Sequence, residues 1–256
     1  SITSTGTVTG GGWGVYAYIE TYGSIDITTA DVIGKTEHGI EIETSSSWNY
    51  HVDIDTSAGT VTGGLDDGTG DGIHINQPGT GRLTITTAGV EGATNGIYAN
   101  DQNPNERHYD GVNSTYYNVA VPIDIDITVS GAVIGGTGAG IVTLTNPNLD
   151  PLDSVNVDAG KTDIQDMVRI TLNDGASVSA ASGIAITNDE SNSLTTVNTG
   201  ASITGSVSLG DGSDEFIFAG GDVSGVTLLD GGDDLDTADG YIDVLTFTNA
   251  SGALMG

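Results

Sequence analysis

The chain has 256 residues, of which 35 are Asp or Glu and only 5 are Lys or Arg, so its formal net charge is −30. Such an acidic surface repels phosphate backbones and anionic lipid, which excludes nucleic acid as a partner and argues against contact with membranes. No apolar run approaches the roughly 20 residues of a membrane-spanning helix, so we expect no direct membrane insertion of this segment. Cys is absent, which excludes disulfides and thiolate metal sites. Aromatic residues make up only 5% of the chain, which predicts a slim core of Val, Ile, Leu and Ala.

One short phrase recurs along the chain, and we call each copy an anchor tetrapeptide. It consists of a small or polar residue, Val or Ile, any residue, and Gly, with Ala180 replacing the glycine once. The copies occupy residues 7–10, 31–34, 60–63, 89–92, 132–135, 177–180, 202–205 and 222–225. Internal repetition of this kind indicates stacked structural units.

Each anchor lies between two further patterns. An alternating apolar pair such as Ile25 and Ile27 precedes most anchors, which is typical of a β-strand. A second glycine with another short apolar strand, such as Gly72 before Ile73, follows most of them. Each repeat therefore carries about three short strands. Spacings of 24 positions from Val8 to Val32 and 25 from Val178 to Ile203 set the basic coil, whereas the spacings of 43 and 45 positions on either side of Val133 predict insertions at about residues 98–122 and 143–168.

A unit of roughly 24 residues with three strands cannot bury its apolar side alone, but stacked units bury a continuous column of Val and Ile. The sequence therefore predicts an all-β fold, a parallel β-helix (solenoid) of about eight coils with two long loop insertions, as a single segment over residues 1–256. An antiparallel β-sandwich is the alternative, because it also uses many short strands and glycine turns. The same three-strand order in every repeat favours the solenoid.

Several repeats resemble the passenger domains of Gram-negative autotransporters, the pertactin-like β-helical adhesins. The resemblance rests on residues 54–63 (IDTSAGTVTG) and 83–98 (LTITTAGVEGATNGIY), and on the glycine–aspartate segments at 205–216 (GSVSLGDGSDEF) and 229–232 (LDGG). The resemblance implies that the β-helix winds in a right-handed sense. It also implies a signal peptide before Ser1 and an outer-membrane translocator barrel after Gly256 in the parent protein.

The function that this resemblance implies is adhesion, self-association or biofilm formation by a secreted, non-enzymatic rod. Its location would be extracellular, on the cell surface of a Gram-negative bacterium. The partners would be a host or bacterial cell-surface protein or glycan, or another copy of the chain. Two alternatives remain, a structural subunit of an extracellular filament or surface layer, and a glycan-active β-helix enzyme.

Calcium is the candidate cofactor. Residues 209–217 approach the calcium-binding nonapeptide of parallel β-rolls, in which glycines free the loop and aspartates supply oxygen ligands. The candidate metal ligands in this region are Asp211, Asp214, Asp230, Asp233 and Asp234. A solvated acidic edge is the alternative interpretation. Asp66, Asp67 and Asp71 form a weaker second cluster.

The first insertion holds the best candidates for ligand contact. It concentrates residue types that are scarce elsewhere in the chain and common at interfaces, namely Arg107, His108, Tyr109, Tyr116 and Tyr117. A loop that only packs over an opening in the rod is the alternative. A second aromatic group near the N-terminus contains Trp13, Tyr16, Tyr18, Trp48 and Tyr50, which can instead cover exposed backbone.

The repeat also predicts where several charged and metal-binding residues lie. Asp26 and Asp53 lie between apolar neighbours, so both should face outward at equivalent places on successive coils. His38, His51 and His74 fall at different places on their coils, which argues against a shared zinc site. The five basic residues do not converge with acids in the sequence, so no catalytic residues are predicted.

Overall fold

A computed structural model describes residues 1–20, 23–44, 49–103, 105–110, 115–120, 124–145, 168–189, 191–210, 212–232 and 243–248. For residues 49–50, 78–80, 102–103, 105–110 and 115–120 it describes the backbone alone. All regular elements in these ranges are β-strands. A search of the same ranges for a helix long and apolar enough to cross a membrane finds none.

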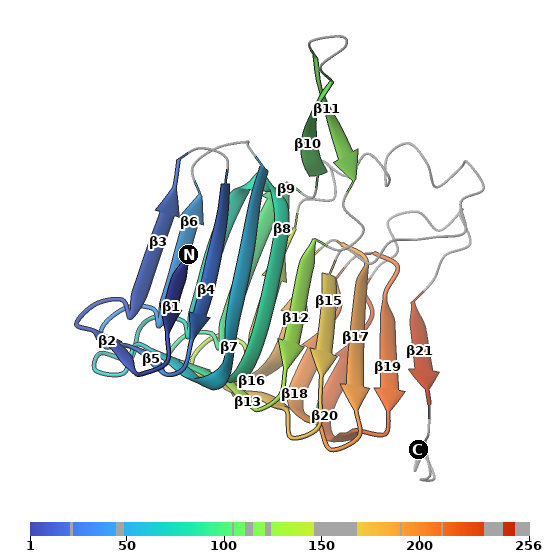
Figure 1. Cartoon of the computed structure of the whole chain (residues 1–256). Helices are drawn as coiled ribbons and strands as arrows, with labels where there is room; N and C mark the ends of the chain where they lie inside the picture. The colour runs from blue at the N-terminus through green and yellow to red at the C-terminus, as the bar shows by residue number, and fades with distance from the viewer. Residues whose placement is uncertain are drawn as a thin grey trace.

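Nineteen strands form one continuous sheet that winds into a parallel β-solenoid with three faces (Figure 1). The first face contains β1 (Ile2–Ser4), β4 (Gly23–Thr29), the start of β7 (Asn49–Gly63), the middle of β8 (Ile73–Gly92), β12 (Ile125–Val129), β15 (Val168–Leu172), β17 (Ser193–Asn198), β19 (Glu215–Ala219) and β21 (Val244–Phe247).

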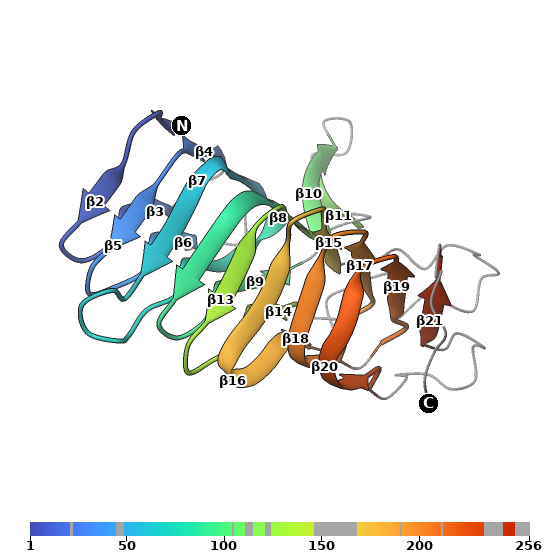
Figure 2. The same cartoon turned by 90° about the horizontal axis from the view of Figure 1, so that it is seen from below.

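The other two faces are built in the same way, and several long strands bend from one face into the next. The second face, seen in Figure 2, contains β2 (Val8–Gly10), β5 (Val32–Gly34), the ends of β7 and β8, β13 (Ala132–Gly135), β16 (Ser177–Asn188), β18 (Ser202–Ser208) and β20 (Asp222–Asp230). The third face contains β3 (Val15–Ile19), β6 (Ile40–Thr44), the start of β8, β9 (Ile97–Asn103), β14 (Ile141–Leu144) and the last residues of β16, β18 and β20.

The anchor tetrapeptides are the strands of the second face. Their apolar residues follow one another in register from coil to coil, as in the pairs Val8 with Val32 and Val133 with Val178. Ala180 pairs with Gly135, so it occupies the expected glycine position. The last anchor lies in β20, which pairs with β18 through shifts in register. The predicted repeat is therefore confirmed as the structural repeat.

The core is the column of aliphatic side chains that the alternating pattern predicts. Ile27, Ile54 and Ile85 lie in register on the first face and are at most 1% exposed. Because the strands pair in parallel along the solenoid, the all-β solenoid prediction is confirmed and the antiparallel sandwich is wrong. Asp26 and Asp53 are register partners in β4 and β7 and are both exposed, as expected.

The second glycine of each repeat makes the corner before the third face, and we call it the corner glycine. A side chain does not fit there because the anchor Val of the next coil occupies the space. A Cβ atom at Gly72 would lie 2.2 Å from Cγ1 of Val90, and one at Gly39 would lie 2.5 Å from Cγ1 of Val61. The requirement is therefore one of close packing between neighbouring coils.

The first insertion contains an antiparallel hairpin of β10 (Asn105–Asp110) and β11 (Thr115–Ala120). β9 stays paired with β8 as far as Asn103, so the chain leaves the solenoid after that residue. Figure 1 shows the hairpin projecting away from the rod. The second insertion falls largely outside the described residues, which resume at Val168 after residue 145.

Candidate functional site

Two rows of chemically active side chains run across the third face in the N-terminal coils. The first row holds the residue before each corner glycine. Hydrogen bonds between neighbouring coils place these residues side by side, since Gly39 N donates to the Asp71 carbonyl (3.0 Å) as Gly14 N does to the His38 carbonyl (3.2 Å). This row is Trp13, His38, Asp71 and Asn95. The second row lies three residues later in each coil and is Tyr16, Glu41, His74 and Tyr98.

Asp71 connects the two rows. Its Oδ2 lies 2.6 Å from Nδ1 of His74, while its Oδ1 accepts hydrogen bonds from the backbone N–H (2.8 Å) and the side-chain amide (2.9 Å) of Asn95. The backbone N–H of Asp71 donates to Nδ1 of His38 at 2.8 Å. Because Nδ1 of each imidazole is engaged by Asp71, Nε2 is the nitrogen that each ring has left for another partner.

The two imidazoles stack on each other, and His74 also stacks on a tyrosine. The ring centroids of His38 and His74 are 4.3 Å apart, and those of His74 and Tyr98 are 4.6 Å apart with an interplanar angle of 8°. Burial lowers the pKa of His38, as does the neighbouring His74, while Asp71 and the nearby carboxylates act in the opposite direction. The low pKa keeps His38 neutral near pH 7, which is the form that binds metals.

Glu41 is the buried acid of this group. Its side chain enters the second row between Tyr16 and His74, and only 8% of the residue is exposed. Trp13 provides a hydrogen bond to the carboxylate. In the described part of the chain the Oε2 atom is buried and has no hydrogen-bond partner. Burial therefore raises the pKa of Glu41.

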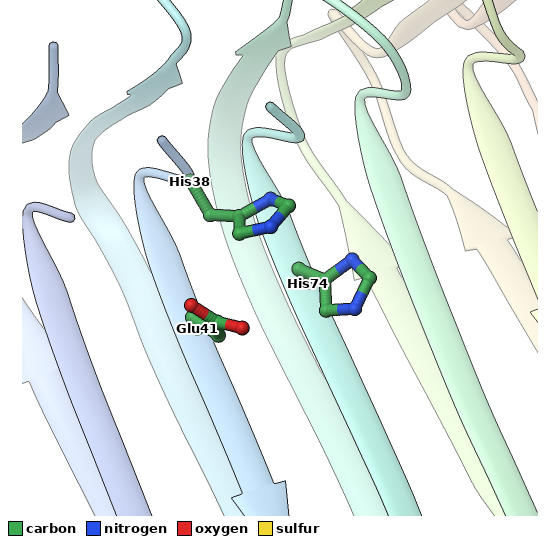
Figure 3. A group of neighbouring side chains, drawn as sticks. All are labelled: His38, Glu41 and His74. Atoms are coloured by element: carbon green, nitrogen blue, oxygen red, sulfur yellow. The ribbon is translucent and has the colours of Figure 1, made fainter. Parts of the chain in front are cut away.

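His38, Glu41 and His74 together form what we call the histidine cluster (Figure 3). Each offers one ligand atom, and these atoms lie within 4.8 Å of one another. His38 and His74 are expected from the sequence not to share a site because they fall at different places on their coils, but this difference does not keep their side chains apart. Their backbone positions in the coil do differ by three residues, but His38 precedes a sharp glycine corner, so its side chain reaches over the start of the next strand.

Beside the histidine cluster lies an exposed group of aromatic side chains that we call the aromatic patch, consisting of Trp13, Tyr16 and Tyr18. They are 44%, 47% and 47% exposed. The ring centroids of Trp13 and Tyr16 are 5.3 Å apart. The Tyr16 hydroxyl donates to Oε2 of Glu43 at 2.8 Å, which raises the pKa of Tyr16. Of the remaining predicted aromatic group, Trp48 and the side chain of Tyr50 lie outside the described residues.

The predicted calcium ligands are described only in part. Asp214 is buried, and its Oδ1 accepts hydrogen bonds from the backbone N–H and the hydroxyl of Ser193, each at 2.7 Å. Asp230 is exposed and accepts a hydrogen bond from the backbone N–H of Gly232. Asp211, Asp233 and Asp234 lie outside the described residues. The contacts of Asp214 join neighbouring coils, and calcium binding here stays a prediction.

The predicted ligand-contact residues lie in the hairpin, whose backbone alone is described. Its register places Arg107 opposite Asn118, His108 opposite Tyr117, and Tyr109 opposite Tyr116. The hairpin therefore brings the five candidate residues, Arg107, His108, Tyr109, Tyr116 and Tyr117, onto two adjacent strands. Their side chains lie outside the described part of the structure.

Sequence reasoning missed the histidine cluster because it measured positions from the anchor Val. Measured from the corner glycine, His38 and Asp71 both occupy the preceding position, and Glu41 and His74 both occupy the second following position. That spacing was the available signal. Comparison with models of protein families, with curated proteins and with solved structures gives no match. The structure itself shows the architecture, which is a parallel β-solenoid.

Proposed function

We propose that this protein is a non-enzymatic binding rod that attaches to saccharides through the aromatic patch. The observation that carries the proposal is the exposure of Tyr16 and Tyr18 on β3 and of Trp13 at the corner just before that strand. Aromatic rings present a flat apolar face, and pyranose rings offer a complementary row of C–H groups. Exposed apolar groups gathered at one place on a surface mark binding sites more often than scattered ones do.

Polar groups next to the aromatic patch match the hydroxyl groups of a sugar. Glu43 on β6 lies beside Tyr16, and farther along the same row of the sheet the amides of Asn76 on β8 and Asn100 on β9 are joined by a 3.1 Å hydrogen bond. Carboxylates and amides accept and donate hydrogen bonds at fixed positions, which gives orientation to a ligand held by stacking. The net charge of −30 favours neutral or cationic saccharides over acidic ones.

The wider biological setting that we propose follows the resemblance to autotransporter passengers. In that setting the rod is displayed outside a Gram-negative cell and serves in adhesion or self-association, with the hairpin β10–β11 as a second contact surface. The repeated coils support this because a solenoid presents a long, stiff surface built from small units. The gene region beyond the Gly256 codon tests it. About a dozen amphipathic strands encoded there support the setting, whereas further coils or a polymerisation domain favour a filament subunit.

Saccharide binding is tested with a panel of immobilised neutral polysaccharides and with fluorescence. The chain has two Trp residues, so the Trp48→Phe variant leaves Trp13 as the single reporter inside the aromatic patch. We expect saturable changes in Trp13 emission with at least one polysaccharide. The Tyr16→Ala/Tyr18→Ala variant should lose at least tenfold in affinity, because two stacking surfaces are removed while β3 remains paired with β6.

The matched control is Ile134→Ala/Ile184→Ala, which removes two side chains that are each 40% exposed elsewhere on the rod. It should bind as the parent does. Equal loss in the control and the tyrosine variant contradicts a specific patch. Absence of binding by the parent protein to the whole panel, with concentration-dependent self-association in sedimentation, overturns the saccharide proposal and supports self-association instead.

A further inference from the structure

We propose that the histidine cluster binds one divalent transition-metal ion, with zinc as the best match to its ligands. The site is separate in chemistry from saccharide stacking and does not depend on it. Two imidazole nitrogens and one carboxylate oxygen form a ligand set that zinc uses with a fourth position left open. Calcium and magnesium prefer oxygen ligands alone, so two His ligands select against them.

The separations of the ligand atoms are close to those around a bound metal, and the two imidazoles, which stack with an interplanar angle of 30°, need to tilt so that their in-plane lone pairs converge. Zinc–ligand bonds of about 2.0–2.2 Å at tetrahedral angles place ligand atoms roughly 3.3–3.6 Å apart. The ligand atoms of His38, Glu41 and His74 lie within 4.8 Å of one another, so each needs to move by no more than about 1 Å. Rotation of the two partly exposed His side chains supplies this movement, while backbone pairing fixes the sheet beneath them.

Asp71 is placed to orient both imidazoles. Its Oδ2 already lies 2.6 Å from Nδ1 of His74, which leaves Nε2 of that ring for a metal ion. A carboxylate bonded to the far nitrogen of a ligating His is the usual support of a zinc site. The same oxygen lies 3.8 Å from Nδ1 of His38. In the metal-free protein Nδ1 of His38 accepts a hydrogen bond from the Asp71 amide, so the ring proton is on Nε2. Metal binding at Nε2 moves that proton to Nδ1. Nδ1 then donates to Asp71 Oδ2 and no longer accepts from the amide.

Glu41 supplies an independent reason to expect a cation. A buried carboxylate oxygen without a hydrogen-bond partner is costly, and native proteins rarely keep one without a use. Oε2 of Glu41 is such an atom among the described residues, and only 8% of the residue is exposed. A metal ion bound to this oxygen satisfies it and neutralises its charge. The surrounding carboxylates of Glu37, Glu43 and Asp71 make the local field favourable to a cation.

The fourth position of the proposed site faces the solvent. The side chains of His38 and His74 are 18% and 24% exposed, whereas Asp71 behind them is 5% exposed. Water or a donor atom of a ligand can therefore complete the coordination from outside.

The test is a titration of the metal-free, untagged protein with Co²⁺, followed by displacement with Zn²⁺. Cobalt in a site of low coordination number gives visible absorption that reports its ligands, and zinc quenches that absorption when it takes the same site. We expect one Co²⁺ per chain, full displacement by one equivalent of Zn²⁺, and no displacement by a large excess of Ca²⁺. Isothermal titration with Zn²⁺ alone gives the dissociation constant.

Four variants assign the site. His38→Ala and His74→Ala should each weaken Zn²⁺ binding at least tenfold, and so should Glu41→Gln, which keeps the shape of the side chain. Asp71→Asn, which keeps the shape of the side chain but removes the charge of the orienting carboxylate, should weaken binding about 10- to 100-fold while preserving one metal per chain. His51→Ala and His108→Ala are the matched controls and should bind as the parent does.

Circular dichroism of every metal-free variant shows whether the solenoid is intact. If a His variant unfolds, Glu41→Gln still tests the site, because replacing a buried charge with a neutral amide of the same shape should leave the solenoid folded. Absence of stoichiometric Co²⁺ or Zn²⁺ binding by the parent protein overturns the proposal. So does binding that survives Glu41→Gln and His74→Ala unchanged, or that disappears in His51→Ala or His108→Ala.

Discussion

His38 and His74 stack with ring centroids 4.3 Å apart, although they occupy different positions in their coils. The contact exists because His38 stands at the corner and His74 on the strand of the next coil, with Asp71 bonded to both. A solenoid corner thus brings residues of different register into one group.

Replacing Glu41 with Gln should stabilise the metal-free protein at neutral pH. Burial raises the pKa of this carboxyl, with Glu43 and Glu37 adding to the effect and His74 opposing it. The folded state then holds the proton to higher pH than the unfolded state, so stability falls as pH rises from the ordinary value of about 4.5 through the raised value. Urea unfolding in EDTA between pH 4 and 8 measures this.

The difference in free energy of unfolding between Glu41→Gln and the parent should be small at pH 4 and grow towards neutral pH. Glu91→Gln is the control, since that residue is exposed and lies on the second face, away from Glu41. A parent protein that is more stable than Glu41→Gln at pH 7 in EDTA contradicts the assignment of a costly buried charge.

Gly72→Ala should destabilise the solenoid by about 1–3 kcal/mol, the usual effect of overpacking. The added methyl group would lie 2.2 Å from Cγ1 of Val90 and 2.8 Å from the carbonyl oxygen of Gly96. Denaturant unfolding measures the change, and Gly6→Ala is the control because nothing lies within 4 Å of its Cβ position.

A double-mutant cycle identifies the cause of that destabilisation. In a Val90→Ala background the clashing methyl group is absent, so Gly72→Ala should cost less there. Equal cost in both backgrounds would show that the backbone of the corner, and not the packing against Val90, requires glycine.

Asp53→Asn should raise stability by a few tenths of a kcal/mol at low ionic strength, because like charges directly opposite on neighbouring strands repel. Asp26 and Asp53 are register partners and both are exposed. Thermal unfolding in 10 mM and 500 mM NaCl provides the measurement, and the gain should shrink in high salt. Glu20→Gln removes one exposed negative charge outside this pair. An equal gain in stability there would show that the effect comes from the net charge of the protein and not from repulsion between Asp26 and Asp53.

Replacing Arg107, Tyr116 and Tyr117 together with Ala should weaken attachment to cells without loss of β-structure. Arg107 lies on β10 and the two Tyr residues on β11, and the hairpin forms its own two-stranded sheet outside the solenoid ladder. Cell-binding assays and far-UV circular dichroism measure the two properties. Comparison with Tyr16→Ala/Tyr18→Ala shows which surface dominates, and unchanged binding in the hairpin variant removes the hairpin from the proposed function.

The sequence alone determined the architecture, because a solenoid is encoded locally and repeatedly. Each coil must place Val or Ile inward at the same register and glycine at the same corner, so Val32, Val61 and Val90 could be aligned by inspection. The outward position of Asp26 and Asp53 followed from the same alternation. Repetition makes such positions predictable because the same physical constraint acts in every coil.

The tertiary structure alone decided the histidine cluster. Its members come from two different positions in two coils, and the stretch from the anchor Val to the corner glycine differs in length between these coils, running from Val32 to Gly39 in one and from Val61 to Gly72 in the other. The anchor spacing therefore does not reveal that they meet. What brings them together is the bend at Gly39 and Gly72, which turns the residue before each glycine over the face that follows. The direction of a side chain at a corner depends on the packing of the neighbouring coil, here Val61 and Val90 against the two glycines, and that packing exists only when the coils are stacked.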